Sequence, residues 1–237
     1  MGEQELEHDE PHKGNIAQRL NWLRAGVLGG NDGIVSTAGI VLGVAGATAA
    51  RSTILTAGIA GLSAGAMSMA VGEYVSVSSQ RDTEQALLEK ERGELADSPD
   101  EELQELTDMY AAKGLSHDLA AEVAVQLTAL DALAAHAEVE LGINPTNLTS
   151  PWRAAFASMV AFTLGSLLPL VAITVPTAHL RVPVTVVAVL LALAVTGVVS
   201  ARIGSAPLAK PFWRNVLGGS VAMAVTYGIG ALVGHVI

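Results

Sequence analysis

Residues 25–50 read AGVLGGNDGIVSTAGIVLGVAGATAA, an apolar run in which Asp32 is the only charged side chain. As an α-helix that rises 1.5 Å per residue, this run is long enough to cross the hydrocarbon core of a bilayer, which is ~30 Å thick. Its glycines recur at four-residue spacing, as in Gly29 with Gly33, which favours close packing against neighbouring helices. The run therefore predicts a membrane helix with one carboxylate inside it.

Further apolar stretches of similar length occur along the chain. They cover roughly residues 53–77, 154–180, 182–201 and 215–237. All 23 acids lie at or before Glu140, so the last 97 residues contain none. We therefore predict an all-α membrane protein with five transmembrane helices, two within residues 25–79 and three within 151–237. Eleven of the 13 Lys and Arg side chains fall in alternate connecting segments, which predicts a cytosolic N-terminus and a C-terminus outside.

The segment 80–150 has a different composition from the apolar stretches. It holds 16 acids against four basic residues, a formal charge of −12. Its helix signals are those of packed helices, because Ser98 and Pro99 begin one helix, Gly114 ends it and Ser116 begins the next. The pattern predicts a three-helix cytosolic metal-binding domain inserted between spans two and three. Residues 1–24 lack an apolar run, which predicts a cytosolic tail and not a signal peptide.

Composition and spacing exclude several function classes. The formal net charge of −10 argues against a nucleic-acid partner, and the absence of cysteine excludes disulfides and thiolate metal sites. The chain has no His-Glu-x-x-His pair, and outside the N-terminal tail it has no Glu-x-x-His pair. We therefore predict no catalytic residue, no permanently bound cofactor and no enzymatic activity.

Three side chains of the first two spans are predicted to share one depth in the bilayer. If the hairpin turns near Arg51, antiparallel packing brings Asp32 level with Met69 and Glu73, which stand four apart and share a helix face. Carboxylates beside a thioether suit Fe²⁺ or Mn²⁺ better than Mg²⁺. The alternatives are a packing hydrogen bond for Asp32, apolar filling for Met69, and a Glu73 that extends to the interface.

The spacing of acids in the segment 80–150 indicates a second site. Glu91 interrupts the leucine stripe that should face the domain core, and Glu94 lies on the adjacent row; the same three-residue spacing recurs at Glu102 and Glu105, and His136 stands one turn before Glu140. Inward-facing carboxylates repel one another unless protons or divalent cations neutralise them. Metal binding there should weaken below about pH 5, near the reference pKa of carboxyl groups. The alternative is an acidic, solvated helix surface.

Three stretches together resemble the vacuolar iron transporter family. They are Gly29-Gly30-Asn31-Asp32-Gly33, the run SMAVGEYVS at 68–76, and Gln80-Arg81-Asp82, and the resemblance extends from about residue 21 to the end. It implies a homodimeric exporter of Fe²⁺, and often Mn²⁺, that exchanges these ions for protons along a path between the two first helices.

The resemblance also implies site residues. It places the membrane site on Asp32 and Met69, with Glu73 nearby. It places the ligands of the cytosolic domain on Glu91, Glu94, Glu102, Glu105 and Glu140. Where plant-type members have a methionine pair, this chain has His136-Ala137, so His136 is a candidate ligand in place of sulfur.

Two function classes remain open from the sequence. One is the exporter of Fe²⁺ or Mn²⁺; the other is a membrane-anchored buffer or sensor of divalent metals that does not transport. A membrane carboxylate level with Met69 favours the exporter, because an anchor has no use for one. The richness in Ala, Gly and Val and the lack of a targeting segment favour a prokaryotic plasma membrane.

Overall fold

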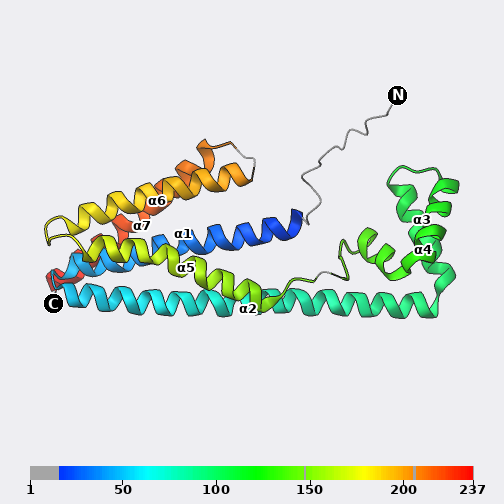
Figure 1. The fold of residues 1–237 in the computed structure, drawn as a ribbon, viewed down its shortest axis with the longest axis horizontal. Helices are drawn as coiled ribbons and strands as arrows, with labels where there is room; N and C mark the ends of the chain where they lie inside the picture. Colours follow the sequence, from blue (N-terminus) through cyan, green and yellow to red (C-terminus); the bar gives the residue numbers. More distant parts are fainter. Residues whose placement is uncertain (1–15, 147, 205–206, 237) are drawn as a thin grey trace, which may run out of the picture. The chain divides into compact units, whose positions relative to one another are not determined.

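The computed structural model describes residues 16–146, 148–204 and 207–236. Within these ranges the chain forms seven helices and no strand, which confirms the all-α class. In chain order they are α1 (Ile16–Ala47), α2 (Arg51–Asp97), α3 (Pro99–Ala112), α4 (His117–Val139), α5 (Pro151–Thr174), α6 (Arg181–Ile203) and α7 (Ala209–Val236) (Figure 1). They fall into two compact units: an acidic unit from Val75 to Pro151, and an apolar unit built from the described residues on either side of it.

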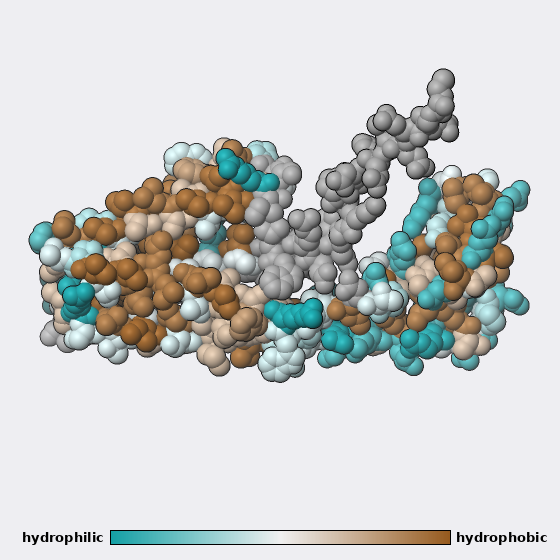
Figure 2. All heavy atoms as spheres, in the orientation of Figure 1, coloured by the Kyte–Doolittle hydropathy of each residue, from teal (hydrophilic) through white to brown (hydrophobic). Residues whose placement is uncertain are grey.

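The apolar unit has hydrophobic side chains both inside and outside. Its core includes Val41 and Leu42 of α1, Ile54 of α2, Ile173 of α5 and Leu193 of α6. Large apolar side chains also cover its surface, as Figure 2 shows. A helix that is hydrophobic all round is buried in a large core or lies in a membrane, and the exposed apolar surface favours the membrane. These features fit a multi-pass membrane protein.

Among the described residues, six helices are long and apolar enough to span a bilayer, one more than the five predicted. The additional one covers His117–Leu141, and it is the least apolar of the six. It qualifies because α4 is rich in alanine and leucine. Within the acidic unit, however, α4 packs against α3 and buries His136 completely.

The helix signals of the acidic segment place most ends correctly. Gly114 follows α3 with a φ of +105°, a conformation that glycine adopts without a Cβ clash, and the Ser116 hydroxyl accepts a hydrogen bond from the Leu119 N–H at 3.4 Å. Ser98 occupies the N-cap position of α3, but its side chain makes no capping hydrogen bond. The helix begins where Ser98 and Pro99 predict, but without a side-chain cap, so Pro99 is the effective signal.

Helix α4 is interrupted, contrary to the prediction of one continuous helix. Asp131 has extended backbone angles, and its carboxylate accepts a hydrogen bond from the Ala134 N–H at 2.9 Å, which caps a new helical start. Leu130, just before the break, is 84% exposed because the helix changes direction after it. The break separates the first part of α4 from the turn that carries His136.

Helix α1 begins before the predicted first span. It starts at Ile16, whereas the sequence assigned residues 1–24 to a solvated tail. The rest of that tail, residues 1–15, lies outside the described residues.

Candidate functional site

The motif at 29–33 places successive side chains of α1 against different neighbours. A Cβ atom on Gly33 would lie 2.2 Å from the backbone oxygen of Phe162, so α1 and α5 approach too closely for any side chain there. The Ser166 hydroxyl of α5 donates to the Gly33 carbonyl at 3.2 Å. The Thr196 hydroxyl of α6 donates to the Asn31 side-chain oxygen at 2.6 Å. These contacts fix the rotation of α1 about its axis.

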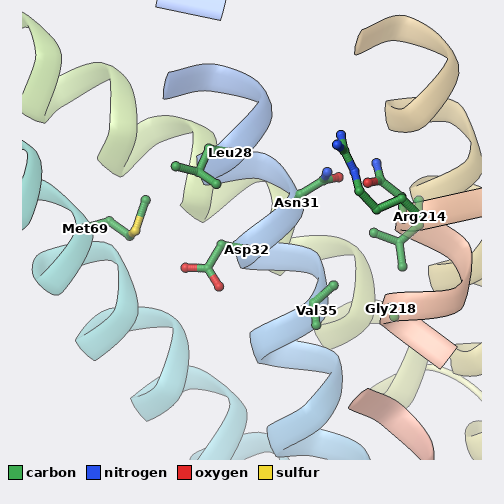
Figure 3. A pocket seen from close by; sticks show the side chains of 10 residues that line it. Leu28, Asn31, Asp32, Val35, Met69, Arg214 and Gly218 are labelled. Atoms are coloured by element: carbon green, nitrogen blue, oxygen red, sulfur yellow. The ribbon is translucent and has the colours of Figure 1, made fainter. Parts of the chain in front are cut away.

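Asp32 lines a cavity of about 410 Å³ that opens to the surface of the apolar unit. The cavity is lined by residues of α1, α2, α6 and α7: Leu28, Asn31, Asp32, Val35, Met69, Leu193, Arg214, Asn215, Gly218 and Gly219. Figure 3 shows Asp32 and Met69 between α1 and α2, and Asn31 and Arg214 on the opposite side of α1. The structure thus brings Asp32 and Met69 to one cavity, as antiparallel packing of the first two spans requires.

Glu73, the third predicted membrane ligand, does not line this cavity. It is half-buried and lies one helical turn beyond Met69 on α2. Sequence reasoning also missed Ser36, whose hydroxyl donates to Asp32 Oδ1 at 2.6 Å, and Arg214 on the cavity wall. The four-residue spacing of Ser36 from Asp32 could have predicted this hydrogen bond, because residues one turn apart are neighbours on a helix.

The acidic unit gathers three of the six predicted ligands in its interior. His136 is fully buried, Glu91 is 3% exposed and Glu102 is 8% exposed. His136 Nδ1 lies 3.0 Å from Glu91 Oε1 and 3.6 Å from Glu102 Oε2. Glu91 lies on α2, Glu102 on α3 and His136 on α4, and each offers a ligand atom within 4.8 Å of the others. We call Glu91, Glu102 and His136 the buried triad.

Burial and crowding change the proton affinity of the triad carboxylates. Burial, and after it the neighbouring carboxylates of Glu140, Glu102 and Glu94, raises the pKa of Glu91 from 4.5 to about 7. Burial also raises the pKa of Glu102, and the Glu105 carboxylate adds to that effect. The metal-free triad therefore holds protons at pH values where exposed carboxylates have lost them.

The other three predicted ligands have different surroundings. The Glu140 carboxylate is partly exposed, and its Oε2 lies 3.9 Å from His136 Nδ1, so it borders the triad. Glu94 is paired with Lys90 Nζ at 2.6 Å. Glu105 is exposed and lines a surface depression on α3 with Glu101 and Asp108. The structure does not bring Glu94 or Glu105 into contact with His136.

The donor atoms of the triad suit a divalent cation. Among the described residues, Glu91 Oε1 and both ring nitrogens of His136 are buried without a hydrogen-bond partner of acceptable geometry. Such unpartnered groups are costly in a protein interior. A cation between them would bind carboxylate oxygens and an imidazole nitrogen, a mixed set that suits Fe²⁺ or Mn²⁺. The three side chains therefore have the donor atoms to hold a metal ion, and protons can neutralise the two carboxylates in its absence.

Comparison with known proteins assigns the chain to a family. Residues 23–231 match the model of the VIT family. A protein named vacuolar iron transporter from Acanthamoeba castellanii is 44% identical over 224 residues, which are 94% of this chain and 82% of the relative. Vacuolar iron transporter homolog 1 of Arabidopsis thaliana is 36% identical over 231 residues, 97% of this chain and 92% of the relative. Vacuolar iron transporter homolog 5 of Oryza sativa subsp. japonica is 38% identical over 216 residues, 91% of this chain and 82% of the relative. The chain therefore belongs to the VIT family.

Proposed function

We propose that this protein transports divalent metal ions, with Fe²⁺ or Mn²⁺ as the substrate, out of the cytosol in exchange for protons. The names of its relatives support metal transport and give no support to an enzymatic role. The observation that carries the proposal is the cavity that Asp32 and Met69 share among helices long enough to span a bilayer. A carboxylate at that depth is costly, and such groups mark ion routes.

The two side chains of the cavity have complementary roles in this proposal. Asp32 supplies negative charge and a hard oxygen ligand, whereas Met69 supplies a soft sulfur ligand that favours Fe²⁺ or Mn²⁺ over Mg²⁺. A carboxylate must be deprotonated to bind a cation, so metal binding releases a proton and metal release permits proton uptake. This linkage at one group is the chemical basis of the antiport. Glu73, one turn away, would relay ions toward Asp32.

The proposed topology has five spans, formed by α1, the first part of α2, α5, α6 and α7. Helix α4 then belongs to the cytosolic unit, and the break at Asp131 with the burial of His136 supports that placement. The distribution of Lys and Arg supports a cytosolic N-terminus and a C-terminus outside. We further propose a homodimer in a prokaryotic plasma membrane, on the strength of the family resemblance and the composition.

The acidic unit would collect metal ions for the transport path. Its charge of −12 attracts divalent cations, and the buried triad with Glu140 at its border would hold one of them. Glu94 and Glu105 would then contribute to capture at the surface and not to the same coordination sphere.

The triad also favours a second candidate function. Three buried ligands can bind metal without any transport, and the apolar helices would then only anchor a buffer or sensor. The two candidates differ in what they require of Asp32, because only the transporter needs a carboxylate in the membrane.

The test is transport in proteoliposomes with an imposed proton gradient. Wild-type protein of verified dimeric size should take up Fe²⁺ and Mn²⁺ in competition with Zn²⁺, while a pH dye records proton movement. Asp32→Asn keeps the side-chain shape and removes the charge, so it should abolish both fluxes. Asp118→Asn, the same change at an exposed position of the acidic unit, is the control and should transport normally. Wild-type flux in Asp32→Asn would refute the transporter and favour the anchored buffer.

A further inference from the structure

Several helix hydroxyls of the apolar unit bond to the backbone of their own helix, whereas those of Ser36, Ser166 and Thr196 donate to other groups. Five of the hydroxyls donate to the backbone carbonyl one turn earlier: Thr163, Thr174, Thr185, Ser220 and Thr226. This is the usual choice of Ser and Thr inside helices. Ser36 also lies in the interior of a helix, but its hydroxyl donates to the Asp32 carboxylate at 2.6 Å.

The Ser36 hydroxyl donates to the carboxylate and not to a backbone carbonyl for an electrostatic reason. A hydrogen bond to an ionised carboxylate is shorter and about twice as strong as one between neutral groups. Ionised Asp32, the form that binds a cation, therefore outcompetes the main-chain carbonyl for the only proton that the hydroxyl can donate. Ser36 is half-buried and does not line the cavity, whereas Asp32 does. The hydroxyl thus reaches the carboxylate without occupying the space where an ion would lie.

We infer that Ser36 is a positioning residue for metal binding by Asp32. Its hydroxyl occupies Oδ1 and holds the carboxylate in one orientation, so that Oδ2 remains available to an ion in the cavity. An aspartate side chain without such a hydrogen bond rotates about two bonds. If metal binding had to restrict this rotation, the lost conformational entropy would weaken the binding. This inference rests on the proposed function, because it assigns Ser36 a role at the same site.

A purely structural role for Ser36 predicts different behaviour. If the side chain only filled space, alanine at 36 would change stability and leave the apparent affinity for metal unchanged. If it positions the carboxylate, alanine should weaken metal binding while the folded protein transports at nearly the same maximum rate. Threonine keeps the hydroxyl and should preserve the affinity.

The experiment compares Ser36→Ala, Ser36→Thr and Ser220→Ala with the wild type in proteoliposomes. Initial rates of Mn²⁺ uptake are measured over a range of Mn²⁺ concentrations, after dimeric size has been verified for each protein. Ser220→Ala removes a hydroxyl of the apolar unit that bonds only to its own helix, so it is the matched control. We expect Ser36→Ala to raise KM roughly tenfold, the loss of one hydrogen bond to a charged group, with the maximum rate within about twofold of wild type. Ser36→Thr and Ser220→Ala should keep the wild-type KM.

The outcomes separate this inference from the proposed function. If Asp32→Asn is inactive and Ser36→Ala has the wild-type KM, the positioning role is overturned and the transport proposal stands. The positioning role is also overturned if Ser220→Ala raises KM as much as Ser36→Ala, or if Ser36→Thr folds as the same dimer and shares the defect. Wild-type flux in Asp32→Asn overturns the proposed function, and the role of Ser36 with it.

Discussion

Replacing Glu91 by glutamine should stabilise the metal-free acidic unit at alkaline pH and abolish metal binding in the triad. The fold raises the pKa of Glu91 from 4.5 to about 7, chiefly by burial. A group with a raised pKa contributes its full stability below pH 4.5, and that stability is lost as the pH rises through about 7. At 1.36 kcal/mol per pKa unit, the ionised carboxylate costs about 3 kcal/mol above pH 7. Glutamine has the same shape and cannot ionise, so it avoids this cost.

The assay is hydrogen exchange of the amides of α3 and α4 in the full-length protein in detergent, followed by mass spectrometry with a chelator present. Exchange measures the free energy of local opening without requiring the acidic unit to unfold by itself. After correction for the intrinsic pH dependence of exchange, Glu91→Gln should be more protected than wild type by about 3 kcal/mol at pH 8. The difference should be small at pH 4.5. Added Mn²⁺ should protect the wild type and leave the variant unchanged.

Glu105→Gln is the matched control, because it removes the same charge from an exposed position of α3. It should match the wild type at pH 4.5 and change protection only slightly at pH 8. Equal protection of Glu91→Gln and wild type at pH 8 would refute the argument that burial of the ionised carboxylate destabilises the metal-free unit. Protection of Glu91→Gln by Mn²⁺ to the wild-type extent would refute the assignment of Glu91 as a ligand.

Three further predictions concern the apolar unit and the topology. Gly33→Ala should destabilise the protein by about 1–3 kcal/mol or prevent its assembly, because the new Cβ would lie 2.2 Å from a backbone oxygen of α5. Gly26→Ala is the control and should be tolerated, because a Cβ there meets nothing within 4 Å. Thermal unfolding in detergent compares the stability of the two variants. Met69→Leu should reduce the apparent affinity for Mn²⁺ in uptake assays at unchanged expression and size, because leucine keeps the volume and removes the sulfur. Cysteines at Ser98 and Ser52 should react with an impermeant reagent from opposite sides of intact cells, and labelling of both from outside would exclude the five-span topology.

The sequence predicts helix ends well wherever a strong local signal stands. Pro99 and Pro151 begin helices and Gly114 follows one, because these residues act through the backbone and need no tertiary partner. The break in α4 escaped prediction for the opposite reason. Asp131 is one acid in an alanine-rich helical run, and its capping bond to Ala134 is visible only in three dimensions.

The acidic ligand set was only partly predictable for a geometric reason. Three-residue spacing makes Glu102 and Glu105 neighbours on α3, but a helix turns about 100° per residue, so the two side chains differ in direction by about 60°. Glu102 faces the interior, and Glu105 faces solvent. The sequence also gave no measure of burial, so the expected loss of metal binding near pH 5 used reference pKa values. Burial of Glu91 raises its pKa to about 7, and the loss should begin there instead.

The motif at 29–33 shows why packing and chemistry are tied together in α1. At Gly33 the backbones of α1 and α5 are in contact, and the Asn31 side chain accepts a hydrogen bond from Thr196 of α6. Asp32, between these two residues, lines the cavity that Met69 also lines. Because a helix rotates as a rigid body, the contacts of Gly33 and Asn31 determine the direction in which Asp32 points. A larger residue at 33 would therefore move the carboxylate as well as loosen the bundle. The glycine that closes the packing therefore also orients the only carboxylate of the first apolar run, so the fold of α1 and the proposed ion site depend on the same residues.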